Sequence, residues 1–141
     1  MDRLGVYADQ GDLVVSQKKV VFTQKLVSVS VAGSMTVQRF LKIMRALFAD
    51  PEFRPGMGIL CDLRDVRSKG IDARSLDTFY GFCAATSKDR GDSRMALVVK
   101  SDLGYGLSRA AQARGDLSDF KIGVFRDLSE AEAWLLTEAA S

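Results

Sequence analysis

The chain has 141 residues, of which 47% are apolar and 27% charged, and its formal net charge is +2. This length is typical of one domain and suffices for a core that needs no disulfide or metal. Two prolines and twelve glycines exclude collagen-like and low-complexity classes, and the low net charge with many apolar residues excludes a disordered chain. We therefore expect a single domain over residues 1–141.

Histidine is missing from the sequence. Its absence excludes Ser-His-Asp and Cys-His catalysis and zinc sites that use imidazole. Cys61 and Cys83 stand apart among apolar neighbours, with no Cys-x-x-Cys motif. We expect them to be buried free thiols, with a structural disulfide as the alternative. This cysteine usage favours a reducing cytoplasm, and we expect no metal and no other cofactor.

The sequence also bears on targeting and on nucleic acid. Met1–Leu4 has no basic segment leading into an apolar run, so we predict no signal peptide. No stretch approaches the roughly 18 apolar residues of a membrane helix. The sequence also has no basic stripe with interleaved aromatic residues, so we expect no nucleic-acid partner. We expect a cytoplasmic protein with no transmembrane segment.

Strands are predicted first along the chain. Residues 26–32 alternate between valine and small residues, the two-residue period of a half-buried strand. Two shorter β-branched runs, 13–15 and 20–23, precede it and flank polar residues 16–19, which predicts an antiparallel hairpin.

A helix follows, because the apolar period then lengthens. Thr36 is the expected N-cap, and Asp50-Pro51 ends the helix, since proline disfavours a helical residue before it. The predicted inward face consists of Val37, Phe40, Leu41, Met44, Leu47 and Phe48.

Strands and helices then alternate to the end of the chain. Residues 58–63 predict a strand buried on both faces, followed by a polar loop at 64–70. Asp72 is the expected cap of a second helix with Leu76, Phe79, Tyr80 and Cys83 inward. A charged turn at 88–93, a strand at 95–99, a helix from Ser101 to about Arg114 and a strand at 120–125 follow. The last helix is expected to begin with a capping box from Ser129 to Glu132 and to turn Ala131, Trp134 and Leu135 inward.

This order predicts an α/β fold. Alternating strands and helices imply parallel pairing through right-handed crossovers, with the N-terminal hairpin as an antiparallel edge. We therefore expect a mixed sheet with mostly parallel strands and about four helices.

Charged residues follow three of the predicted strands, in segments 62–65, 100–102 and 126–127. Ligands of open α/β sheets bind beyond the carboxyl ends of the strands, so these segments predict a polar cleft. The alternative is that they cap helices and solvate loops. Two carboxylate pairs are candidates for acid–base chemistry, Asp62 with Asp65 and Asp62 with Asp102.

The segment Ser101–Arg109 contains Gly104 and Gly106, each of which costs a helix about 1 kcal/mol relative to alanine. Close helix–sheet packing is the favoured explanation, and approach of a ligand to the helix N-terminus is the other. Tyr105 and Arg109 follow Asp102 at helical spacing and extend the same patch. The basic segment from Arg64 to Lys69 is predicted to be a solvated turn, with contact to phosphates or an acidic membrane as the alternative.

Three segments resemble the bacterial SpoIIAA-like family: Leu60–Val66, Met95–Arg109 and Val124–Leu135. The resemblance spans roughly residues 25–136, and the family is related to STAS domains and by fold to CRAL-TRIO lipid-binding domains. It implies a small STAS-like α/β domain that regulates or binds rather than catalyses.

Anti-sigma-factor antagonists carry a phosphorylated serine in an Asp-Ser-Ser-Gly-like turn. This chain has Ile71-Asp72-Ala73-Arg74-Ser75-Leu76 in that region, where Ser75 is a loose counterpart. The comparison with lipid carriers is weak, because 141 residues leave little room for a cavity beside a core.

We therefore expect a non-enzymatic module that engages a protein partner or a small anionic ligand. The alternatives are a module that binds lipid or membrane surfaces and a carboxylate-dependent hydrolase. A further alternative is that the protein forms a homodimer through an exposed edge strand or through the phenylalanine-rich helices. The expected ligand-binding residues are Asp62, Arg64, Ser101, Asp102, Tyr105 and Arg109.

Overall fold

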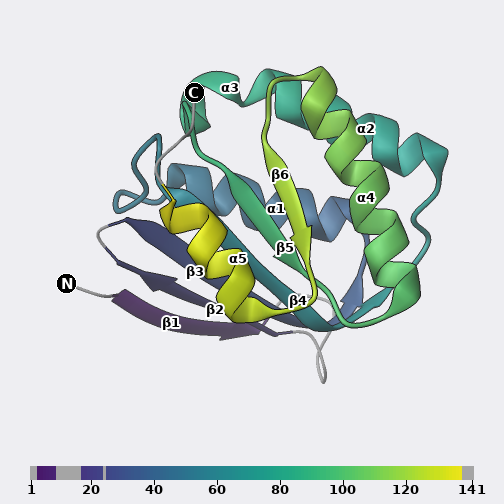
Figure 1. Cartoon of the computed structure of the whole chain (residues 1–141), viewed down its shortest axis with the longest axis horizontal. Coiled ribbons are helices and arrows are strands. Elements are labelled where there is room, and N and C mark those ends of the chain that lie inside the picture. Colours follow the sequence, from purple (N-terminus) through teal and green to yellow (C-terminus); the bar gives the residue numbers. More distant parts are fainter. Residues whose placement is uncertain (1–2, 9–16, 24, 138–141) are drawn as a thin grey trace.

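Six strands lie side by side in chain order in the computed structural model, which describes residues 3–8, 17–23 and 25–137 (Figure 1). Both pairings that involve β2 are antiparallel, and β3 to β6 pair in parallel. The strands are β1 (Arg3–Ala8), β2 (Gln17–Phe22), β3 (Leu26–Met35), β4 (Gly58–Ser68), β5 (Met95–Val98) and β6 (Ile122–Phe125). The predicted α/β class with a mostly parallel mixed sheet is confirmed.

The helices cover the two faces of this sheet unequally. They are α1 (Val37–Ala49), α2 (Ala73–Ala85), α3 (Ser87–Arg90), α4 (Asp102–Leu117) and α5 (Leu128–Leu136). Each parallel strand is added on the same side of the one before it, so right-handed crossovers place α1, α2 and α4 on one face. There α2 packs between α1 and α4, while α5 lies on the other face against β4 to β6 (Figure 1).

The core has two parts, one on each face. Val27, Val29 and Val31 are at most 4% exposed and join the larger core beneath α1, α2 and α4, as their alternation predicts. A smaller core beneath α5 consists of Leu60, Ala96, Val98, Ala131 and Leu135, with Phe125, Leu128 and Trp134 packed against it. Burial on both faces explains the nearly continuous apolar runs of β4 and β5.

Side-chain caps begin the long helices where the sequence predicts them. The Thr36 hydroxyl accepts a hydrogen bond from the Arg39 amide at 3.1 Å, and Asp72 accepts one from the Ser75 amide at 2.9 Å. The capping box at Ser129 is wrong, because Asp127 caps α5 instead. Its carboxylate accepts hydrogen bonds from the amides of Ser129 and Glu130, at 2.8 and 3.1 Å.

The N-terminal hairpin is confirmed, but its strands differ from those predicted. Strand β1 was not predicted, and the proposed run at 13–15 lies outside the described residues. Residues 17–19, predicted as a turn, belong to β2 because they pair with Ser30–Ala32 of β3. Strand pairing therefore overrides the polar character of these residues.

Strand β4 is longer than predicted and includes most of the basic segment. After a register shift between Ser30 and Ala32, the end of β3 pairs with residues 65–68. Arg64 to Ser68 are therefore strand residues and not a solvated turn, because the backbone of β3 offers them hydrogen-bonding partners.

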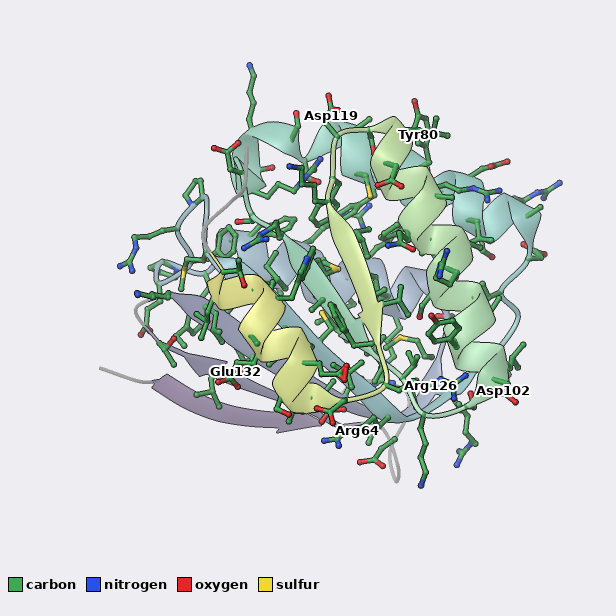
Figure 2. All side chains as sticks on the ribbon, in the orientation of Figure 1. Arg64, Tyr80, Asp102, Asp119, Arg126 and Glu132 are labelled. Carbon is green, nitrogen blue, oxygen red and sulfur yellow. The ribbon has the colours of Figure 1, made fainter. Side chains whose placement is uncertain are left out.

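Two smaller predictions on α2 and α3 are also wrong. Tyr80 was expected to face inward but is 40% exposed, at the end of the molecule far from Asp102 (Figure 2). Residues 88–90 of the predicted charged turn belong to helix α3, and Arg90 in this helix is only 2% exposed. Arg90 can be buried because the nearby Cys83 carbonyl and Thr86 hydroxyl and the distant Ser118 carbonyl accept its hydrogen bonds.

Candidate functional site

The carboxyl ends of the parallel strands bring the predicted charged segments to one edge of the sheet. Arg64, Asp102 and Arg126 gather along this edge, at the bottom of Figure 2, whereas Tyr80 and Asp119 lie at the opposite end. The edge also holds the N-termini of α4 and α5, which follow β5 and β6 directly. The topology therefore places these segments together, as the rule for open α/β sheets requires.

Asp62 and Arg64 form a two-point ion pair on β4. The Arg64 Nε lies 2.8 Å from Asp62 Oδ1, and Nη2 lies 2.8 Å from Oδ2. These hydrogen bonds lower the pKa of the Asp62 carboxyl from its ordinary value of 3.8, against the opposing effect of partial burial. Asp62 is therefore held as a carboxylate beside a guanidinium.

A second arginine, Arg126, links β6 to the start of α4. Its Nη2 lies 2.8 Å from Asp102 Oδ1, its Nη1 donates to the Lys100 carbonyl at 3.1 Å, and its guanidinium sits 4.7 Å from the centre of the Tyr105 ring. Sequence reasoning placed Arg126 at the right edge but did not select it as a site residue. Asp102 therefore pairs with Arg126 at the carboxyl end of β6, and Arg109, expected to extend the same patch, is exposed farther along α4.

These pairings bear on the hydrolase alternative. Asp62 and Asp102 each face an arginine and not each other. Within residues 3–8, 17–23 and 25–137, no group of three or more Cys, Asp or Glu side chains is placed to hold a metal ion. Cys61 and Cys83 are free and buried, as expected, and burial raises their thiol pKa values to about 12 and about 11. They are therefore poor nucleophiles.

A cavity of about 430 Å³ opens beside this edge, between the sheet and the N-terminal parts of α1, α2 and α4. This finding corrects the expectation that the chain is too short to hold one. The helices α1, α2 and α4 follow the carboxyl ends of β3, β4 and β5, and their N-terminal parts leave this space between them and the sheet unfilled. Its apolar lining residues are Met35, Val37, Phe40, Leu63, Val66, Ile71, Leu76, Phe79, Leu97, Val99, Leu107 and Ala111, together with Gly104.

The polar lining of the cavity is small and distinctive. Its charged members are Arg64 and Lys100, and its hydroxyl groups belong to Thr36, Ser68, Ser101 and Ser108. The Ser101 hydroxyl accepts a hydrogen bond from the Gly104 amide at 2.9 Å and so caps α4. Among the predicted site residues, Arg64 and Ser101 line the cavity. Asp62 does not line the cavity itself but forms an ion pair with Arg64, which does. Asp102, Tyr105 and Arg109 lie outside the lining.

The two glycines of α4 have different surroundings, so the predicted packing explanation does not cover both. A Cβ on Gly104 would lie 3.0 Å from the Ser101 hydroxyl oxygen and 3.6 Å from Val99 Cβ. A Cβ on Gly106 would meet nothing within 4 Å. Close packing is therefore wrong for Gly106, whereas Gly104 keeps room for the Ser101 cap at the wall of the cavity.

Ser75, the loose counterpart of the phosphorylated serine, is 8% exposed at the start of α2. Its hydroxyl donates to the Asp72 carboxylate at 3.0 Å. The structure thus uses this serine to build the helix N-terminus.

Comparisons with known proteins concern the fold alone. No protein-family model and no curated protein matches the sequence. The structure is similar to the crystal structure of an uncharacterized protein from Shewanella loihica PV-4, of the DUF3478 family. The TM-score is 0.51 at 14% identity, and the match covers 95% of this chain and 93% of the other. No helix in the described ranges is long and apolar enough to cross a membrane. The similar protein has a SpoIIAA-like fold, and this chain has that fold as well.

Proposed function

We propose that this protein binds a small amphipathic anion, with the apolar body of the ligand in the cavity and its charged group at the mouth. One observation carries the proposal: the cavity is apolar, and its charged lining residues are both cations. Its volume of about 430 Å³ falls within the range of about 300–1,000 Å³ that is usual for small-molecule sites.

The interior favours an apolar ligand body. Phe79, Leu97 and Val99 are at most 4% exposed and form part of the cavity wall. Covering such surface contributes about 25 cal/mol for each Å² of apolar area removed from water. A strongly hydrated ligand would lose its hydration shell in this space without replacement.

The mouth favours an anionic group. Lys100 and Arg64 are exposed, and none of the described residues that line the cavity carries a carboxylate to repel an anion. The N-termini of α1 and α4 also open onto the cavity through Thr36 and Ser101, and the positive ends of helix dipoles favour negative charge. Arg64 is already bound to Asp62, so we assign the main attraction to Lys100.

The lining supports binding and not turnover. The described residues of the lining include no Asp, Glu or Cys, and the sequence has no His. The lining serines therefore have no adjacent carboxylate or imidazole to act as a general base. We infer that the bound molecule leaves unchanged.

The charge assignment is tested by calorimetric titration with decanoate and with the uncharged decanol. We expect decanoate to bind more tightly. Lys100→Gln should weaken the binding of decanoate about fivefold, which corresponds to about 1 kcal/mol for an exposed ion pair. The binding of decanol should stay unchanged. Equal affinity for both ligands in the unmodified protein would contradict the anionic mouth.

The location is tested by filling the cavity from α4. Ala111 lines the cavity, whereas Ala113 on the same helix is exposed. Ala111→Leu should abolish decanoate binding, because the larger side chain occupies the ligand's space, and Ala113→Leu should leave it unchanged. Circular dichroism checks that both variants fold. Unchanged binding in Ala111→Leu would place the ligand elsewhere. Failure of the unmodified protein to bind decanoate or decanol would overturn the proposal and favour a protein partner.

A further inference from the structure

Among the residues that the structure describes, Ser108 differs from the other buried polar residues because no described group hydrogen-bonds its side chain. The described residues include four buried polar or charged side chains, namely Ser75, Arg90, Ser93 and Ser108. Ser75 bonds to Asp72, Arg90 donates to backbone carbonyls, and Ser93 accepts from the Gly56 amide at 2.9 Å. Ser108 is 7% exposed and lines the cavity, yet no protein group in the described part of the chain bonds its hydroxyl.

The surroundings of Ser108 show where its hydrogen-bonding partner must come from. No side-chain nitrogen or oxygen that is fully shielded from solvent lacks a partner in the described ranges, so the Ser108 hydroxyl borders open space. For a residue with so little exposure on the cavity wall, that space is the cavity itself. Because buried hydroxyls are normally hydrogen-bonded, its partner is supplied by whatever fills the cavity.

We propose that Ser108 is a hydrogen-bonding subsite, and that the ligand carries a hydroxyl or carbonyl oxygen within its apolar body. This inference rests on the proposed function and narrows its ligand class from amphipathic anions to hydroxylated or oxo-substituted ones. A plain alkyl chain would shield the Ser108 hydroxyl from water and leave it unpaired, which disfavours that ligand.

The position of Ser108 sets where the ligand oxygen belongs. Ser108 lies seven residues after Ser101 on α4, about 10 Å along the helix axis at 1.5 Å per residue. Ser101 is exposed beside Lys100 at the mouth, whereas Ser108 is buried. The ligand oxygen is therefore separated from the anionic group by roughly two helical turns. Ser68 also lines the cavity and has no side-chain hydrogen bond to a described residue, but it is half-buried at the end of β4, within reach of solvent.

The test compares decanoate with hydroxydecanoates that carry one hydroxyl at successive positions along the chain. Calorimetry should show a maximum in affinity at one internal position, about five- to tenfold above decanoate, the value of one net hydrogen bond. Ser108→Ala should remove this preference, by weakening the favoured hydroxydecanoate and strengthening decanoate. Ser30→Ala, on the opposite face of the sheet, is the matched control and should keep the preference.

The outcomes separate this inference from the proposed function. If decanoate binds but no hydroxydecanoate exceeds it, or if the preference survives in Ser108→Ala, the subsite is wrong and the cavity proposal stands. If none of these acids binds the unmodified protein, the proposed function fails, and the subsite fails with it. The Ser108 hydroxyl makes no hydrogen bond to any described residue, so we expect Ser108→Ala to fold normally, which thermal unfolding verifies.

Discussion

Arg90 is a charged residue whose side chain is buried and hydrogen-bonded inside the protein. Its guanidinium donates hydrogen bonds to the Cys83 carbonyl, to the Thr86 hydroxyl at 3.0 Å and to the Ser118 carbonyl at 3.2 Å, and lies 4.1 Å from the centre of the Phe120 ring. It therefore ties the end of α2 to the loop after α4. Local sequence indicates only a charged turn here, because Ser118 and Phe120 are distant in the chain.

Replacement of Arg90 by methionine keeps much of the apolar volume and removes every donor. We expect Arg90→Met to lower the free energy of unfolding by about 3 kcal/mol, because buried acceptors are left unpaired. Urea denaturation measures the change. Lys88→Met, on the exposed side of α3, is the matched control and should shift stability by no more than about 0.5 kcal/mol. Equal losses in both variants would show that the buried hydrogen bonds of Arg90 contribute little.

At the scale of elements, α4 contains two glycines with different roles. Gly106 lies in the helix with open space where a Cβ would be. We expect Gly106→Ala to raise the free energy of unfolding by about 1 kcal/mol, the helix-propensity difference between the two residues. Gly104→Ala should gain less or lose stability, because its Cβ would crowd the Ser101 cap at 3.0 Å. Thermal unfolding of both variants distinguishes them, and an equal gain would show that the cap tolerates the methyl group.

The secondary-structure elements also show which features the local sequence pattern predicts and which it does not. The helix at 37–49 and its Thr36 cap follow from apolar spacing and from one nearby hydroxyl. The end of β4 does not, since residues 65–68 become strand only because β3 pairs with them. Likewise, Asp127 caps α5 ahead of the predicted Ser129, which itself donates to the Asp127 carboxylate at 2.6 Å.

For the whole molecule, carboxylates determine how stability depends on pH. Hydrogen bonds lower the pKa values of three aspartates from the ordinary value of 3.8. Arg64 donates to Asp62, Ser75 donates to Asp72, and Ser129 and Glu130 donate to Asp127. Each pKa is lower in the folded than in the unfolded chain. The unfolded chain therefore takes up protons first on acidification, and stability present above about pH 4 is lost as the pH falls through the folded pKa values.

We expect the free energy of unfolding, measured by urea titration across this range, to fall steadily below about pH 4. Asp72→Asn keeps a good N-cap but removes one titrating group, so its stability should decline less steeply with acid. An identical acid slope in Asp72→Asn would mean that the Asp72 cap does not couple folding to protonation.

The sequence by itself determined the features that depend on near neighbours. The alternation in β3, the apolar face of α1, the caps Thr36 and Asp72, and the edge at which charged segments meet all follow from periodicity and chain order. Only the tertiary structure decided the pairing of Arg126 with Asp102, the burial of Arg90, and the cavity with its Ser108 hydroxyl. Each of these depends on groups from separate elements, whose distances are set by how the helices pack on the sheet.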